Sequence, residues 1–228
     1  THSSAKAIKE IVFAPSQTDS QTLTIDNRSR NYHDFTADET RTLVCKPGED
    51  INVTIRHEGA WMHGYVYIDL DNDGQFSFNE GSTDQSNTDL VSFFFYSGDF
   101  SNDASGVNSL GTSISGGSRN PGAEIPCPAF TAPTAEGTYR IRFKEDWNSV
   151  DAGGQIAADG TCTGANGFLA NNGTIVDAVL KVRNLSGIVD VVNSAGDEGR
   201  PIYDLQGRRV VRPVRGIYVS NGRKILMK

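Results

Sequence analysis

The chain of 228 residues contains only two Met and no long stretch with apolar residues at helical spacing. A helical calcium sensor exposes a Met-rich groove when it opens, so the scarcity of Met argues against that class. The absence of a 3.6-residue period argues against a helical bundle and leaves strands as the main elements. No apolar run is long enough to cross a membrane, so we expect no transmembrane segment.

Cysteine is also scarce, and an odd total leaves at least one of Cys45, Cys127 and Cys162 unpaired. None of them has the Cys-x-x-Cys spacing of a structural zinc site. Cys127 and Cys162 lie in loop-like sequence, and an oxidising compartment would allow a disulfide between them. The sequence leaves open whether that disulfide forms.

The motifs of common hydrolases are missing. No Gly-x-Ser-x-Gly elbow accompanies His57 and His63, which gives a Ser-His-Asp hydrolase little support. A glycosidase holds two carboxylates roughly 5–10 Å apart. No spacing marks such a pair among the acids of the second half, which are Glu124, Glu136, Glu145, Asp146 and Asp151. We therefore interpret them as solvated loop acids and keep a glycan-degrading hydrolase as the alternative function.

The formal net charge of -7 is unevenly distributed. Residues 1–184 carry 13 Lys and Arg against 24 Asp and Glu, a net of -11, whereas residues 185–228 carry 8 against 4, a net of +4. An acidic body disfavours nucleic acid as a partner and suits a cation.

Glycine and the polar turn formers are abundant, with 24 Gly and 8 Pro, and they predict short strands joined by turns. Residues 6–13 fit either a short helical turn or a first strand, and residues 97–122 predict a long exposed loop. Alternation at 50–56 and 138–143 predicts half-buried antiparallel strands, whereas 90–96 is apolar enough to be buried on both faces. Further strands are predicted at 64–68 and 175–182. The expected fold is all-β, an antiparallel β-sandwich of jelly-roll or Ig-like type.

The basic end of the chain differs from the rest. Residues 201–210 and 215–226 predict two small hairpins, the second turning at Asn221-Gly222. Two hairpins make a marginal core, so we expect them to pair with residues 187–192, to dock on the main domain, or both. We place the domain boundary between a sandwich at 1–184 and a small β-hairpin segment at 185–228.

One stretch carries a specific chemical signal, the run Asp-Leu-Asp-Asn-Asp-Gly-Gln-Phe-Ser-Phe-Asn-Glu at 69–80. It has the spacing of a twelve-residue calcium loop, with oxygen ligands at positions 1, 3, 5, 7, 9 and 12. These positions hold Asp69, Asp71, Asp73, Gln75, Ser77 and Glu80.

Two residues inside this run support the same interpretation. Gly74 stands at position 6, where the chain must turn sharply with a positive φ. Phe76 is apolar and can anchor the loop in a core. The strand-like residues 64–68 precede the loop in place of the entering helix of an EF-hand. We expect a structural calcium ion (Ca2+) in a loop between two strands, against the alternative of a plain polar turn.

Trp61 and Trp147 are the two tryptophans, and their flat faces suit stacking against a sugar ring. Packing in the core or at a sheet edge is the simpler interpretation. Together they are the possible ligand platform that the sequence offers.

Four segments give a family resemblance. They are Tyr-His-Asp-Phe-Thr at 32–36, the aspartate-rich stretch 61–80, Gly-Thr-Tyr-Arg-Ile-Arg at 137–142 and Gly-Thr-Ile-Val-Asp at 173–177. Over about residues 8–183 the chain resembles the GEVED domain of secreted bacterial proteins. The resemblance implies an extracellular β-sandwich module attached to adhesins, peptidases and other surface proteins, without enzymatic activity of its own. The closing motif departs from the family, since Thr174 and Val176 stand where it has two glutamates.

Residues 187–228 resemble the C-terminal sorting segment of Bacteroidetes proteins, through Ile-Tyr-Asp-Leu-Gln-Gly-Arg-Arg-Val at 202–210, Gly-Ile-Tyr at 216–218 and the final Lys228. That resemblance implies a small β-sandwich domain read by secretion machinery. The expected function is therefore a secreted or cell-surface, non-catalytic binding or adhesion module. Its expected partner is a glycan or a surface protein, and a structural spacer in a surface assembly is the second alternative.

Overall fold

The computed structural model describes residues 6–79, 84–96, 106–114, 122–147, 155–156, 162–163, 173–184, 190–192, 201–220 and 223–227. The chain divides into two compact units, Thr1–Arg183 and Asn184–Lys228. The division falls one residue before the expected boundary.

The first unit contains two large β-sheets and, among the described residues, one two-stranded sheet. Sheet A has the order β10-β5-β1-β2, in which every neighbouring pair is antiparallel. Its strands are β1 (Ile8–Pro15), β2 (Gln21–Thr24), β5 (Asp50–His57) and β10 (Glu124–Thr131). The first strand therefore includes residues 8–13, which settles the choice between a helical turn and a strand.

Sheet B has the order β3-β14-β11-β6-β7-β8-β9, with β4 also paired to β14. Its strands are β3 (Tyr32–Asp34), β4 (Leu43–Cys45), β6 (Met62–Ile68), β7 (Leu90–Tyr96), β8 (Gly106–Asn108), β9 (Ser113–Ile114), β11 (Gly137–Trp147) and β14 (Thr174–Val182). The pairs are antiparallel, except that β3 and β4 run parallel to β14. Smaller elements are β12 (Gln155–Ile156), paired with β13 (Cys162–Thr163), and the 3₁₀ helix η2 (Glu39–Arg41), which Asp38 caps.

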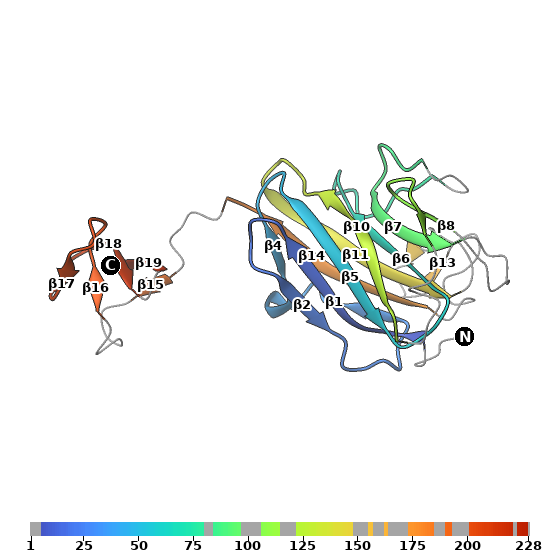
Figure 1. Ribbon diagram of the computed structural model, residues 1–228, viewed down its shortest axis with the longest axis horizontal. Helices are drawn as coiled ribbons and strands as arrows, with labels where there is room; N and C mark the ends of the chain where they lie inside the picture. Colours follow the sequence, from blue (N-terminus) through green and yellow to red (C-terminus); the bar gives the residue numbers. More distant parts are fainter. Residues whose placement is uncertain are drawn as a thin grey trace. The chain divides into compact units, whose positions relative to one another are not determined.

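The two sheets stack as a sandwich (Figure 1). Alternate residues of β1, β5 and β10 on one sheet and of β6, β11 and β14 on the other form one continuous apolar core. Ile55, Phe143 and Val176 are typical members, each 0% exposed. The all-β, mostly antiparallel sandwich expected from the sequence is confirmed.

Sheet B is buried on its outer face as well. Phe94 of β7 lies in the inter-sheet core, whereas Leu90 and Phe93 belong to a second apolar cluster on the outer side. That outer cluster consists of Tyr65, Tyr67, Phe76, Leu90 and Phe93. The expectation of burial on both faces is confirmed for residues 90 to 94, of which Val91 alone is partly exposed.

Strand β11 departs from the expectation of a half-buried strand. Arg142 occupies an outward position of the pattern predicted for 138–143, yet it is 3% exposed, and Lys144, two residues further on the same face, is 0% exposed. Arg142 makes a two-point ion pair with Asp177 of β14, with Nε to Oδ1 at 2.7 Å and Nη2 to Oδ2 at 2.9 Å. The same carboxylate accepts hydrogen bonds from Arg140 and from the Tyr32 hydroxyl. Charged residues can be buried here because they are paired and hydrogen-bonded.

The expectation of a long exposed loop at 97–122 was partly wrong, because β8 and β9 lie within that range and extend sheet B. Apolar and polar alternation is too short there to mark a strand, so only pairing to β7 reveals it.

Cys45 and Cys127 are buried free thiols, so Cys127 is not half of a disulfide with Cys162. Burial raises the pKa of both thiols to about 12.

The second unit is a five-stranded sheet in the order β15-β19-β18-β16-β17. Both predicted hairpins are confirmed, the first from β16 (Ile202–Tyr203) and β17 (Arg209–Val210), the second from β18 (Gly216–Ser220) and β19 (Arg223–Met227). Strand β15 (Asp190–Val192) pairs parallel with β19, which agrees with the expected pairing of the hairpins with residues 187–192.

Within the described residues, no helix has the length and apolar character needed to span a membrane.

The buried ion pair gives a testable consequence. Asp177→Asn keeps the size of the side chain but leaves Arg142 buried without a full counter-charge, so unfolding of the first unit should become easier by about 3–5 kcal/mol. Both tryptophans lie in this unit, so denaturant unfolding followed by Trp fluorescence reports on it alone. The matched control is Asp26→Asn, which removes the exposed partner of Arg41 and should cost less than about 1 kcal/mol. Equal effects of the two substitutions would contradict the central role of Asp177.

Candidate metal centre

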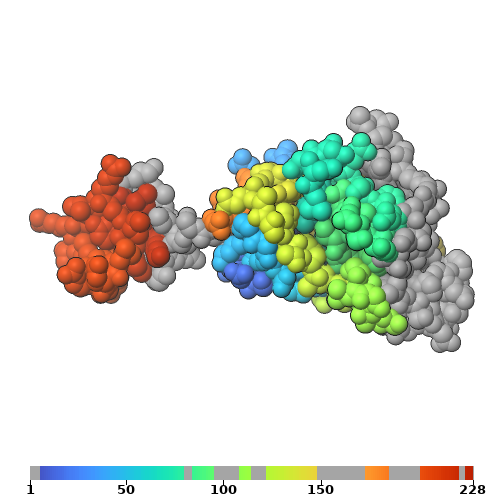
Figure 2. All heavy atoms as spheres, turned by 90° about the horizontal axis from the view of Figure 1, so that it is seen from above, coloured from blue at the N-terminus to red at the C-terminus, as the bar shows by residue number. Residues whose placement is uncertain are grey.

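The predicted calcium loop lies in the connection from β6 to β7. Strand β6 ends at Ile68, whose N–H donates to the Asp89 carbonyl at 2.9 Å, and the Asp69 N–H donates to the Arg140 carbonyl at 3.0 Å. The loop therefore starts from a fixed strand end and returns next to it. Its surroundings are strands, as residues 64–68 predicted, and it forms part of the surface of the first unit (Figure 2).

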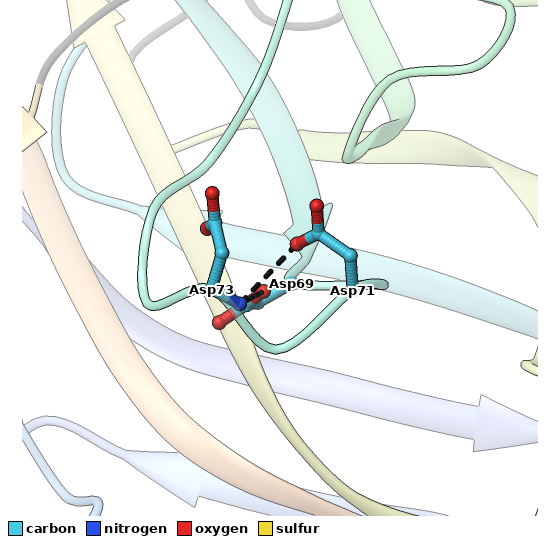
Figure 3. A group of neighbouring side chains, drawn as sticks. All are labelled: Asp69, Asp71 and Asp73. Carbon is cyan, nitrogen blue, oxygen red and sulfur yellow. Dashed lines mark hydrogen bonds between the residues drawn. The ribbon is translucent and has the colours of Figure 1, made fainter.

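Three of the predicted ligands come together. One carboxylate oxygen from each of Asp69, Asp71 and Asp73 lies within 4.8 Å of the others (Figure 3). Asp69 is 3% exposed, whereas the other two face solvent. Carboxylate oxygens at one point are the ligands that a hard cation such as calcium prefers.

Backbone hydrogen bonds fix these carboxylates. The Asp69 carboxylate accepts from the N–H groups of Asp73 at 3.1 Å and Gly74 at 3.0 Å. The Asp73 carboxylate accepts from the Gln75 N–H at 2.7 Å. The chain can curl this tightly because Gly74 adopts a φ of +85°, which confirms the expected turn at position 6. A Cβ at Gly74 would have no neighbour within 4 Å, so the requirement for glycine is conformational rather than steric.

Phe76 anchors the loop, as predicted. Its side chain is 5% exposed and meets the Tyr67 ring edge-on, with 5.7 Å between centroids. The guanidinium carbon of Arg142 lies 4.4 Å from the centre of the same ring. The loop is thus seated on the outer cluster and on the buried ion pair of sheet B.

The other three predicted ligands are Gln75, Ser77 and Glu80. Gln75 and Ser77 are exposed, and the Ser77 hydroxyl donates to the Asp89 carboxylate at 2.8 Å. The structure thus directs the Ser77 side chain to Asp89. Glu80 lies outside the described residues.

Asp89 is the residue that sequence reasoning missed. It is 5% exposed, and its carboxylate accepts from the Leu70 N–H at 2.9 Å and from the Ser77 N–H at 2.7 Å. It therefore ties positions 2 and 9 of the loop together across the start of β7. The only signal for it is an acidic residue directly before a strongly apolar strand.

The electrostatics of the cluster favour a cation. Burial raises the pKa of the Asp69 carboxyl, and the negative charges of Asp89 and Asp73 raise it further, against the lowering effect of the Gly74 and Asp73 hydrogen bonds. A bound cation would relieve this repulsion and keep Asp69 ionised. Three convergent carboxylates on a loop held by its own backbone therefore fit calcium.

Trp61 and Trp147 lie at the other end of β6. Trp147 pairs with Met62, the first residue of the strand, so Trp61 directly precedes that pair. Trp147 packs against the inter-sheet core, and the Lys6 ammonium lies 3.4 Å from its ring centre, which suits the packing interpretation for this residue. Trp61 is half-buried with a φ of 62°.

The candidate acids of a hydrolase do not converge where they are described. The interpretation as solvated loop acids is wrong for Glu145 and Asp146, because both lie on β11 and are 0% exposed. They are consecutive on the strand, so their side chains point to opposite faces of the sheet. Glu124 pairs with Arg56 on sheet A, and Asp151 lies outside the described residues.

Comparisons with known proteins give little more. No protein-family model matches the chain, and no curated protein matches it. One similar solved structure is the solution NMR structure of the CARDB domain of PF1109 from Pyrococcus furiosus, at 16% identity and a TM-score of 0.26, covering 62% of this chain and 85% of that one. A similarity of that strength carries no argument about function.

The role of Asp89 can be separated from metal binding. Asp89→Asn places an amide where Ser77 and Leu70 need acceptors, so the first unit should lose about 1–3 kcal/mol of stability even in a chelator. Denaturant unfolding in a chelator, followed by Trp fluorescence, measures the loss. Asp71→Asn is the control, because Asp71 accepts a single long bond of 3.3 Å and should change little without metal. A loss seen with calcium alone would show that Asp89 acts through the ion instead.

Proposed function

We propose that this chain is a non-catalytic binding or adhesion module of a secreted or cell-surface protein, and that a calcium ion at Asp69, Asp71 and Asp73 braces it. The single observation that carries the proposal is the meeting of these three carboxylates on a loop seated on sheet B. The resemblance to GEVED domains supports the surface location. The resemblance of the basic second unit to sorting segments suggests contact with secretion machinery.

The calcium acts as a structural ion in this proposal. Extracellular calcium sites work with dissociation constants of about 10⁻⁴–10⁻³ M because ambient calcium is high. An ion at 100 times its dissociation constant stabilises a fold by about 2.7 kcal/mol. That is a sizeable share of the roughly 5–15 kcal/mol by which a domain is stable.

The ligand surface is proposed at the opposite end of β6. The strand spans seven residues, so Trp61 lies roughly 20 Å from Asp69. A ligand at Trp61 could not touch the ion, which argues for a brace rather than for calcium-mediated binding. Trp61 is the better candidate for stacking on a glycan, because Lys6 covers one face of Trp147.

Calcium should raise the melting temperature of the first unit by about 5–10 °C at 100 times the dissociation constant, and a chelator should remove the rise. Asp71→Ala should abolish this response, because it deletes one ligand while disturbing one weak hydrogen bond. Thermal unfolding followed by Trp fluorescence measures both. Asp84→Ala, an exposed acid of the same connection outside the cluster, should keep the full response. An unchanged melting temperature in native protein would remove the calcium from the proposal.

Glycan binding should depend on Trp61. A glycan-array screen of the full chain should return ligands whose signal falls at least tenfold in Trp61→Ala, because the ring that we propose for stacking would be lost, and stacking of a flat group on one aromatic ring contributes about 1–3 kcal/mol. The control is Tyr203→Ala, which removes an exposed aromatic ring of the second unit. An array without any ligand would favour the structural spacer, and release of shortened glycans would favour the hydrolase.

A further inference from the structure

Glu145 occupies an unusual place in the sandwich. Along β11, Tyr139, Ile141 and Phe143 point into the inter-sheet core, and Trp147 packs against it. Side chains of a strand alternate between faces, so Glu145, between Phe143 and Trp147, points into the same core. Its side chain is 0% exposed. A carboxyl group thus replaces an apolar residue in the middle of the packing.

No described residue satisfies this carboxyl group. Neither Glu145 oxygen has a hydrogen-bond partner, and the same holds for the Thr174 hydroxyl. Strand pairing places Glu145 opposite Gly64 on β6 and opposite Thr174 on β14. In the row Phe94–Gly64–Glu145–Thr174, Glu145 and Thr174 are therefore two polar side chains between the apolar row of Val66, Phe143 and Val176 and the row that contains Met62 and Trp147.

The described residues around Glu145 and Thr174 offer the Glu145 carboxyl group no counter-charge. A Cβ on Gly64 would meet Ile125, Ile55 and Cys127 of the facing sheet, which are apolar or, in Cys127, a thiol that burial keeps neutral. The next inward residue of β5 is His57, a buried imidazole whose pKa burial lowers to about 4. Lys6 lies over the Trp147 ring.

Asp146, the neighbour in sequence, adds a negative charge from the other face of the sheet. Burial raises the pKa of Glu145 well above its ordinary value, and the charge of Asp146 raises it further. An ionised Glu145 would be an unpaired charge in a low-dielectric interior, where the usual response of a carboxyl is to take up a proton.

We propose that Glu145 is held as a neutral carboxylic acid in the core, and that loss of its proton at higher pH loosens the sandwich at the end that carries Trp147. The side chain thus acts as a proton-binding switch built into sheet B. This inference does not depend on calcium or on a glycan.

The direction of the pH effect follows from linkage. The folded state binds the Glu145 proton more tightly than the unfolded chain, in which the pKa is near 4.5. The stabilisation is complete below pH 4.5 and is lost as pH rises toward the pKa of the folded state. Over that range the equilibrium constant for unfolding should rise about tenfold per pH unit.

The first experiment observes the proton in the native protein. In the full chain with ¹³C-labelled glutamate, the carboxyl carbon of Glu145, assigned by its absence in Glu145→Gln, should keep the chemical shift of a neutral acid as the pH rises above 4.5. The carboxyl carbon of exposed Glu39 is followed in the same spectra for comparison. A Glu145 signal that titrates with a midpoint near 4.5 would overturn the proposal, including the case in which an internal water satisfies the carboxylate.

The second experiment measures the consequence. Denaturant unfolding by Trp fluorescence from about pH 4.5 to 8 should show the native protein losing stability relative to Glu145→Gln, with the ratio of their unfolding constants changing about tenfold per pH unit until Glu145 ionises. His57 is present in both proteins, so its own titration cancels in the ratio. Glu39→Gln is the matched control and should leave the pH dependence unchanged. A constant ratio between native protein and Glu145→Gln would overturn the proposal, and the NMR titration decides it independently if that variant fails to fold.

Discussion

The ion pair between Arg142 and Asp177 connects the strands of sheet B to the loop that carries the carboxylates. The two residues are direct partners in the β11–β14 register, so their two-point contact fixes how these strands align. The guanidinium of Arg142 also lies over Phe76, the anchor of the loop. Taking two charges out of water is costly, and further hydrogen bonds from Arg140 and Tyr32 offset part of that cost. One buried pair therefore holds both the sheet and the carboxylate-bearing loop in place.

This arrangement requires sheet B to be covered on both faces. The inner face packs on sheet A, and the outer face carries the aromatic cluster together with Arg142, Lys144 and Asp177. Asp71 and Asp73 of the loop face solvent, whereas Arg142, Lys144 and Asp177 of the sheet are buried. The loop is thus both a cover for the sheet and the place where carboxylates remain accessible to a cation. These two roles explain why an apolar Phe76 stands among acidic neighbours.

Much of this could be predicted from local sequence, where local chemistry decides the outcome. Alternation predicted β5, the continuous apolar run predicted a doubly buried β7, and the requirement for positive φ predicted Gly74. The role of Asp89 could not be predicted from the sequence, because it depends on β7 returning beside β6, which is a contact between distant positions. Burial of Arg142 and Lys144 was equally hidden, since a charged residue in an alternating strand normally marks the solvent face. The inward position of Glu145 was hidden for the same reason, because only the pairing of the strands shows which face of the sheet its side chain occupies.

The buried ionisable groups of the first unit make its stability depend on pH in two opposite directions. His57 and His63 are buried with pKa values lowered to about 4 and about 3, so their contribution is complete above pH 6.5 and is lost as pH falls through those values. The raised pKa of Glu145 acts in the opposite direction. The pKa of the Asp69 carboxyl is raised in the folded protein as well, so without an ion its effect has the same direction as that of Glu145, and only the proposed calcium would require an ionised Asp69. Asp69 directly follows the last residue of β6, whereas Glu145 pairs with Gly64 near its start. Carboxyl groups at both ends of one strand therefore favour the protonated folded state, whereas the two buried imidazoles favour the neutral one, so the two kinds of group oppose each other as the pH changes.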